Sequence, residues 1–113
     1  HYSPRARVVL IERGAARSIE RLLRAHLEQG PVGLIGHTPV DVNHPKLYAI
    51  RLGGGAHHYA RSIYAALREL DEKNPRVILV EGISEGGEGA AVMDRLRRAA
   101  SEIIPRSGGG GRP

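Results

Sequence analysis

Glycine-rich turns that precede helical segments are the residues of this sequence best suited to binding chemistry. Gly86, Gly87 and Gly89 follow a short apolar run and open an amphipathic segment. In that setting, free backbone N–H groups and the positive end of the helix can hold a phosphate or a carboxylate. The turn lacks the Lys-Ser/Thr pair of a P-loop, and Glu88 would repel an anion. A candidate anion loop and a tight structural turn therefore both remain open, and residues 53–55 allow the same two readings.

Other site chemistries find less support in the sequence. The first strand-to-helix turn, residues 12–16, holds a single glycine, whereas a dinucleotide fold needs the spacing G-x-G-x-x-G there. Among the six histidines, His57 and His58 are neighbours that face different sides of a helix. His37 and His44 share a loop without a third ligand. Since cysteine is absent as well, we predict no catalytic residue, no metal site and no cofactor in this chain.

The elements that must position these turns alternate between strands and helices. Apolar runs at residues 7–11, 32–36, 47–52 and 76–81 predict four buried strands. Amphipathic patterns predict helices over residues 15–29, 56–73 and 89–104, the last with Ala99 and Ile103 facing inward. This order predicts a Rossmann-like three-layer α/β sandwich, with a mostly parallel sheet of about four or five strands and helices on both faces. Because only a loop joins the second and third strands, they could also be antiparallel, or a further short strand could lie between them.

Charge and length bound the remaining possibilities. The 113 residues carry a net charge of +5 and a pI of about 10.2, which fits an acidic partner such as nucleic acid. Many basic residues have acidic neighbours at helical spacing, for example Glu20 with Arg24, and this is typical of a solvated helix surface. No apolar run approaches the roughly 20 residues of a membrane span, and we expect no membrane partner. The lack of cysteine fits a reducing compartment, and we expect a cytoplasmic protein.

Three stretches of the sequence resemble the C-terminal domain of long-form threonylcarbamoyl-AMP synthases, the two-domain members of the YrdC-like family. Residues 1–6, HYSPRA, resemble the end of the interdomain linker motif S-P-G-M-x-Y-R-H-Y-A/S-P. Residues 64–71 resemble the helix pattern L-Y/F-x-A-L-R-x-L-D of that family. Residues 89–96, followed by Ala99 and Ala100, resemble its pattern G-x-A-x-x-D/N-R-L-x-x-A-A. We therefore expect a piece of a longer protein, with the linker ending at residue 6, a Rossmann-like domain over residues 7–104 and a glycine-rich tail over residues 105–113.

The resemblance implies a role without catalysis by this chain. The complete enzyme makes threonylcarbamoyl-AMP and pyrophosphate from ATP, threonine and bicarbonate, with Mg²⁺, for the threonylcarbamoyladenosine modification of tRNA. Its chemistry belongs to an N-terminal YrdC-like domain, and the linker crosses the mouth of that domain's active site. The resemblance thus marks His1, Tyr2 and Pro4 as lid residues. It makes the N-terminal domain the partner of this chain, and we expect no direct tRNA contact.

The helix patterns of the resemblance predict structure rather than catalysis. We expect the side chains of these patterns to pack inward or to form ion pairs that fix helix against sheet or domain against domain. They are Leu67, Arg68, Asp71, Asp94, Arg95 and Leu96. Two other functions stay open from the residues alone. One is a small-ligand or nucleotide-sensing module at the glycine turns, and the other is an RNA-contacting domain.

Overall fold

Five strands and three α-helices make up the described part of the chain. The computed structural model describes residues 4–53 and 55–106. In chain order the elements are β1 (Arg7–Ile11), a 3-10 turn (Ala16–Ser18), α1 (Ile19–Leu27), β2 (Val32–Gly36), β3 (Leu47–Arg51), α2 (Gly55–Asp71), β4 (Val77–Glu81), α3 (Glu88–Ala99) and β5 (Glu102–Ile104).

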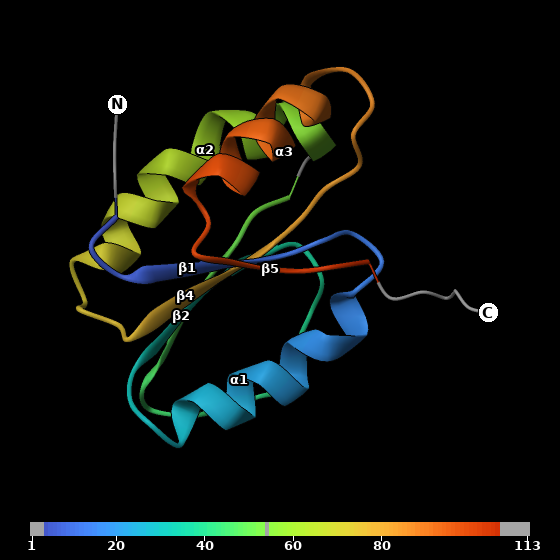
Figure 1. Cartoon of the computed structure of the whole chain (residues 1–113). Coiled ribbons are helices and arrows are strands. Elements are labelled where there is room, and N and C mark those ends of the chain that lie inside the picture. The colour runs from blue at the N-terminus through green and yellow to red at the C-terminus, as the bar shows by residue number, and fades with distance from the viewer. Residues whose placement is uncertain (1–3, 54, 107–113) are drawn as a thin grey trace.

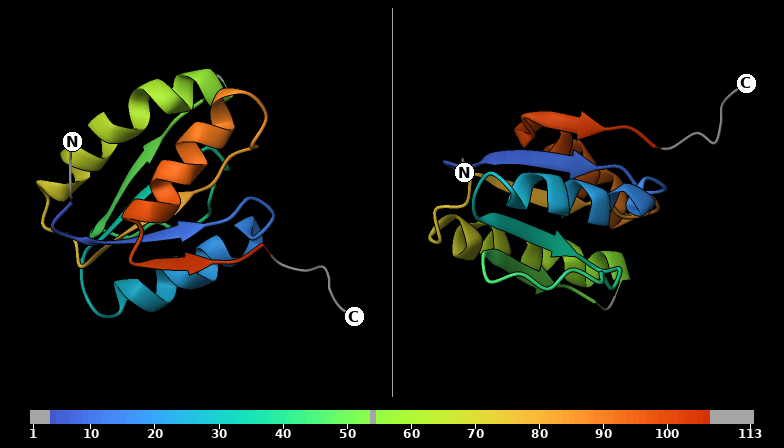
Figure 2. Two further views of the ribbon diagram at one scale, coloured as in Figure 1. Left: turned by 45° about the horizontal axis from the view of Figure 1, so that its top comes forward. Right: turned by 90° about the horizontal axis from the view of Figure 1, so that it is seen from below.

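All five strands form one parallel sheet in the order β3-β2-β4-β1-β5. Figure 2 shows β3 and β5 at its two edges. Strand β4 lies at the centre, and all five of its residues are buried, as expected for a strand covered on both faces. The predicted α/β fold with a parallel sheet is confirmed.

Helices cover both faces of the sheet. Helix α1 lies on one face, and α2 and α3 lie side by side on the other (Figure 1). Successive side chains of a strand point to opposite faces, and β1 shows this alternation. Val8 and Leu10 belong to the hydrophobic cluster under α2 and α3, whereas Val9 and Ile11 belong to the cluster under α1.

The strand connections explain which helix lies on which face. The chain moves toward the β3 edge from β1 through α1 to β2 and then β3, and it returns through α2, β4 and α3 to β5. Right-handed crossovers place connections of opposite direction on opposite faces. The loop over residues 37–46 follows this rule, since its Val40 and Val42 pack against the cluster under α1. Strands β2 and β3 are therefore parallel, and no strand lies between them.

The prediction of one helix over residues 89–104 was wrong at its C-terminal end. Helix α3 ends at Ala99, which is exposed, and Ala100 adopts an extended conformation. The N–H of Ser101 then donates to the carbonyl of Val8, and residues Glu102–Ile104 pair with β1 as strand β5. Pairing satisfies backbone groups that an uncovered β1 edge would leave open, and paired isoleucines favour a strand. Ile103 is consequently 40% exposed instead of facing inward.

No helix in the described part of the chain is long and apolar enough to cross a membrane.

Candidate functional site

Asp71, the last residue of α2, holds the chain segment that leads into β1. Its carboxylate accepts hydrogen bonds from the backbone N–H groups of Arg5 and Ala6, each at 3.0 Å. The Arg5 guanidinium approaches the same carboxylate at 3.5 Å and donates to the backbone carbonyl of Asp71 at 3.0 Å. That carbonyl lies in the last turn of α2, and it also accepts the backbone N–H of Asn74 at 3.1 Å. Asp71 is 6% exposed, so residues 5 and 6 are fixed to the end of α2 by bonds largely shielded from water.

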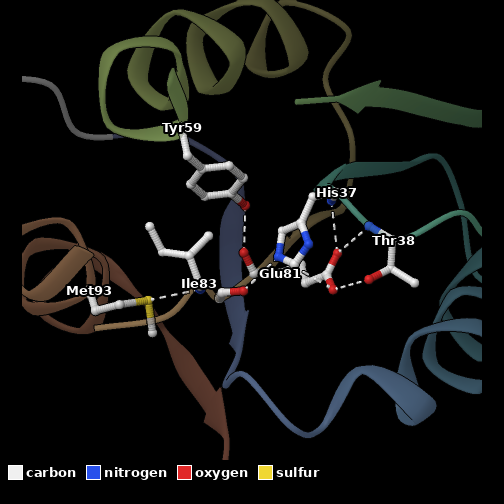
Figure 3. A network of polar contacts seen from close by, with 7 residues as sticks. His37, Thr38, Tyr59, Glu81, Ile83 and Met93 are labelled. Atoms are coloured by element: carbon white, nitrogen blue, oxygen red, sulfur yellow. Dashed lines mark hydrogen bonds and ion pairs between the residues drawn. The ribbon is translucent and has the colours of Figure 1, made fainter. Parts of the chain in front are cut away.

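Glu81 links the carboxyl ends of β2 and β4, at the opposite end of the strands from the Asp71 anchor (Figure 3). Its Oε1 accepts the backbone N–H groups of His37 at 2.8 Å and Thr38 at 2.9 Å. Its Oε2 accepts the Thr38 hydroxyl at 2.5 Å. Glu81 is 3% exposed, and a Cβ at Gly36 would lie 2.9 Å from Oε1. Glycine at that position therefore leaves room for the carboxylate to approach the start of the β2–β3 loop.

Tyr59 and His37 complete this network from the side of α2. The Tyr59 hydroxyl donates to the backbone carbonyl of Glu81 at 2.5 Å. Burial, reinforced by the Glu81 charge, raises the pKa of Tyr59, so the phenol keeps its proton and remains a donor. The Nε2 of His37 lies 2.9 Å from the carbonyl of Gly82, and because a carbonyl only accepts, Nε2 carries the proton. The His37 ring meets the Tyr59 ring edge-on, with centroids 5.8 Å apart.

A cavity of about 250 Å³ opens beside this network, at the carboxyl ends of the strands. Its lining comes from the segments that follow four different strands: Arg13, His37, Leu52, Gly55, Ala56, Tyr59, Ile83 and Ser84. Neighbouring strands β1 and β4 send their connections to opposite faces of the sheet. In open α/β sheets, this is the position at which ligands bind.

Arg97 of α3 ties together the turns that follow β1 and β4. Its guanidinium forms a two-pronged pair with Glu12, at 2.8 and 3.0 Å, and reaches Glu85 at 2.7 Å. The hydrogen bonds to Glu12 and Glu85 raise the pKa of Arg97, and the bond from Arg97 lowers the pKa of Glu85. Two carboxylates close to the cavity are thus already neutralised.

The predicted anion loop lies next to the cavity without lining it. Gly86 and Gly87 are exposed, with nothing within 4 Å of an added Cβ. Gly87 has φ 55°, a left-handed value that favours glycine. Gly89 is buried, and a Cβ there would lie 1.8 Å from the carbonyl oxygen of Ser84. Packing therefore accounts for Gly89, while anion binding at this loop remains a prediction.

The predicted structural residues divide into buried and exposed positions. Leu67 and Leu96 are 2% and 1% exposed. Asp94 pairs at 2.7 Å with Arg98 of its own helix, and both side chains face solvent. Arg68 and Arg95 are exposed on α2 and α3.

The predicted lid residues lie at the edge of the described chain. Pro4 is half-buried beside the Asp71 anchor, whereas His1 and Tyr2 lie outside the described residues. Among residues 4–53 and 55–106, no group of three or more His, Asp or Glu side chains is placed to hold a metal ion.

Sequence reasoning missed the network around Glu81. Glu81 directly follows four buried apolar residues of β4 and precedes Gly82. An acidic residue at the carboxyl end of a central strand is a usable signal, because that end of a parallel sheet hosts sites. The partners His37 and Tyr59 carry no such signal, since they are 44 and 22 residues away.

Comparisons with known proteins agree with this architecture. Residues 1–101 match the family described as threonylcarbamoyl-AMP synthase, C-terminal domain. The threonylcarbamoyl-AMP synthase of Pyrococcus abyssi is 38% identical over an alignment of 108 residues that covers 92% of this chain and 31% of that protein. The chain therefore spans less than a third of the length of this relative.

Solved structures show the same fold. The crystal structure of P. abyssi Sua5 complexed with L-threonine superposes with a TM-score of 0.78 at 37% identity, over 92% of this chain and 31% of that one. A C-terminal Sua5 domain from Pyrococcus horikoshii gives 0.68 at 27% identity, over 90% of this chain and 98% of that one. The chain belongs to the family of threonylcarbamoyl-AMP synthase C-terminal domains.

Proposed function

We propose that this chain is a non-catalytic accessory domain of a threonylcarbamoyl-AMP synthase, and that it anchors the linker that closes the active site. The reaction converts ATP, threonine and bicarbonate to threonylcarbamoyl-AMP and pyrophosphate for tRNA modification. A separate N-terminal YrdC-like domain would bind these substrates and be the partner of this chain. The similarity of the chain to under a third of the P. abyssi synthase supports this division.

The Asp71 anchor is the observation that carries the proposal. Two backbone N–H groups at the end of the linker, those of Arg5 and Ala6, bind one buried carboxylate. Hydrogen bonds to a charged group contribute roughly 1.5–3 kcal/mol each. Tyr2, a proposed lid residue, lies three residues before Arg5, and a residue spans at most about 3.6 Å. The chain length thus limits Tyr2 to within roughly 11 Å, and His1 to within roughly 14 Å, of this fixed point.

Confinement of a lid matters for this reaction because its intermediates react with water. A carbamate of threonine and a mixed phosphate anhydride are both lost to hydrolysis. A closed lid excludes water and strengthens electrostatic interactions around the phosphates. His1 and Tyr2 supply hydrogen-bond donors for substrate oxygens, and Pro4 restricts the backbone between them and the anchor.

The test is Asp71→Asn in the complete synthase, with Glu69→Gln on the same helix as a matched control. Asn keeps the size of the side chain but replaces one accepting oxygen with a donor. We expect a loss of about 1 kcal/mol in anchoring, hence a roughly fivefold fall in kcat/KM for pyrophosphate release. The exposed Glu69 carboxylate makes no hydrogen bond or ion pair with the residues described, so its variant should keep full activity.

Two results would contradict the proposal. Unchanged kcat/KM in Asp71→Asn, with a confirmed loss of the anchor by amide hydrogen exchange at residues 5 and 6, would remove the anchoring role. Pyrophosphate release from ATP by the 113-residue chain alone would show that it is itself catalytic.

A further inference from the structure

We propose that the cavity at the carboxyl ends of the strands binds a small molecule with one phosphate or carboxylate group on a partly apolar body. The cavity is lined by residues from the ends of β1, β2, β3 and β4 and from the start of α2. This location is separate from the linker anchor and uses none of its residues.

The inner walls of the cavity are apolar. Leu52 and Ile83 are each 7% exposed, and Tyr59 is 1% exposed. The Tyr59 hydroxyl is already bonded to the Glu81 carbonyl, so the tyrosine offers its ring rather than its hydroxyl. A volume of about 250 Å³ is below the range of roughly 300–1,000 Å³ that drug-sized ligands occupy. The ligand, or the part of it that enters, is therefore small, comparable with an aromatic acid or with part of a single nucleotide.

Arg13, an exposed residue of the cavity lining, supplies a positive charge to this site. Its guanidinium has no hydrogen-bond or ion-pair partner among residues 4–53 and 55–106. The carboxylates that flank the lining in sequence, Glu12 beside Arg13 and Glu85 beside Ser84, are both bound to Arg97. A free guanidinium beside an apolar cavity favours a ligand with an oxyanion, since charge-assisted hydrogen bonds are strongest in such settings.

Two further acidic residues near the cavity do not neutralise the positive charge of Arg13. Glu81 is buried behind His37, and its oxygens already accept three hydrogen bonds. Glu88 forms a pair with His57 at 2.6 Å. The N-terminal turn of α2, at Gly55 and Ala56, adds backbone N–H groups that have no partner within the helix. Arg13, the Ser84 hydroxyl and these N–H groups are the donors available to an oxyanion.

The experiment titrates the ¹⁵N-labelled 113-residue chain with AMP, benzoate and inorganic phosphate, observed by amide chemical shifts. The related C-terminal Sua5 domain from P. horikoshii has been crystallised as a domain, so we expect this unit to fold on its own. We expect saturable shifts at His37, Ala56 and Ser84 with AMP or benzoate at millimolar concentration. A response to AMP alone identifies a phosphate ligand, and a response to benzoate alone identifies a carboxylate ligand.

Variants separate the cavity from general charge attraction. Arg13→Gln should weaken binding about tenfold, the equivalent of one charge-assisted hydrogen bond. Arg61→Gln, which removes an equal charge from an exposed site on α2, should leave binding unchanged. Ala56→Leu should fill the cavity and abolish binding while the dispersed amide spectrum shows an intact fold. Equal weakening in Arg13→Gln and Arg61→Gln, binding of inorganic phosphate alone, or no saturable shift with any probe would overturn the proposal.

Discussion

Replacement of Glu81 by glutamine tests how strongly one carboxylate holds the carboxyl ends of β2 and β4 together. Glu81 of β4 receives two backbone N–H groups and one hydroxyl from the first two residues after β2. Glutamine has nearly the same shape, so it leaves the packing intact. It changes the charge of the acceptor and turns one accepting oxygen into a donor, which the Thr38 hydroxyl can still accept.

The size of the effect follows from these three bonds. Hydrogen bonds to a charged group contribute roughly 1.5–3 kcal/mol and neutral ones roughly 0.5–1.5 kcal/mol, so three weakened bonds amount to about 3 kcal/mol. Glutamine also removes the cost of burying a charge, which offsets part of that loss. We expect Glu81→Gln to lower the free energy of unfolding by about 2 kcal/mol. With an m-value of about 2 kcal/mol/M, the urea midpoint would fall by about 1 M.

Urea denaturation followed by circular dichroism measures this difference. The control is Glu102→Gln in β5, whose carboxylate makes an exposed 3.5 Å pair with Arg7 and should change stability by less than about 0.5 kcal/mol. Thr38→Val, alone and combined with Glu81→Gln, should give a coupling energy of about 1 kcal/mol. If Glu81→Gln proves no more destabilising than Glu102→Gln, the carboxylate does not hold β2 to β4 as described.

Two further substitutions test other parts of the fold. Gly89→Ala places a Cβ 1.8 Å from the Ser84 carbonyl oxygen, so it should lower the free energy of unfolding, measured by urea denaturation, by about 3 kcal/mol. Gly86→Ala, whose Cβ would have nothing within 4 Å, should change that free energy by less than about 0.5 kcal/mol. Equal losses in the two variants would contradict the packing described at Gly89. Burial, with the Arg76 charge, lowers the pKa of His26 below 6.5 in the folded chain, and its buried Nδ1 has no hydrogen-bond partner among the residues that the structure describes. The contribution of neutral His26 to the free energy of unfolding is therefore complete above pH 6.5 and is lost as the pH falls through the lowered pKa. His26→Gln should flatten this part of the curve of unfolding free energy against pH. An unchanged slope in the variant would refute the assignment to His26.

The sequence allowed the fold to be predicted where the pattern of side chains is local. Strands covered on both faces appear as uninterrupted apolar runs, and the residues of β1, β2 and β4 have this form. Strand β5 was missed because its three residues continue the helical periodicity of α3. Only the free edge of β1, which is distant in sequence, makes the extended conformation favourable there.

The same distinction separates the predicted site residues from the missed ones. The resemblance marked Asp71, but its partners at residues 5 and 6 are 66 and 65 positions away, and no periodicity connects them. The contacts of Glu81 with the β2–β3 loop span 43 and 44 residues. Both sets of contacts arise from the crossover topology. It places the end of β4 beside the start of the β2–β3 loop, and the end of α2 beside the segment that enters β1.

Helix α2 contributes to both candidate sites, one at each end. Gly55 and Ala56 border the cavity, and Asp71 closes the linker anchor. The 17 residues of α2 rise about 1.5 Å each, so the two ends lie roughly 25 Å apart. Between them Tyr59, Ile63, Ala66, Leu67 and Leu70 are buried in one continuous cluster. A ligand in the cavity could therefore influence the linker only by moving the whole helix against this packed core. The hydrogen bonds of Tyr59 to Glu81 and of Asp71 to the linker oppose that motion at both ends.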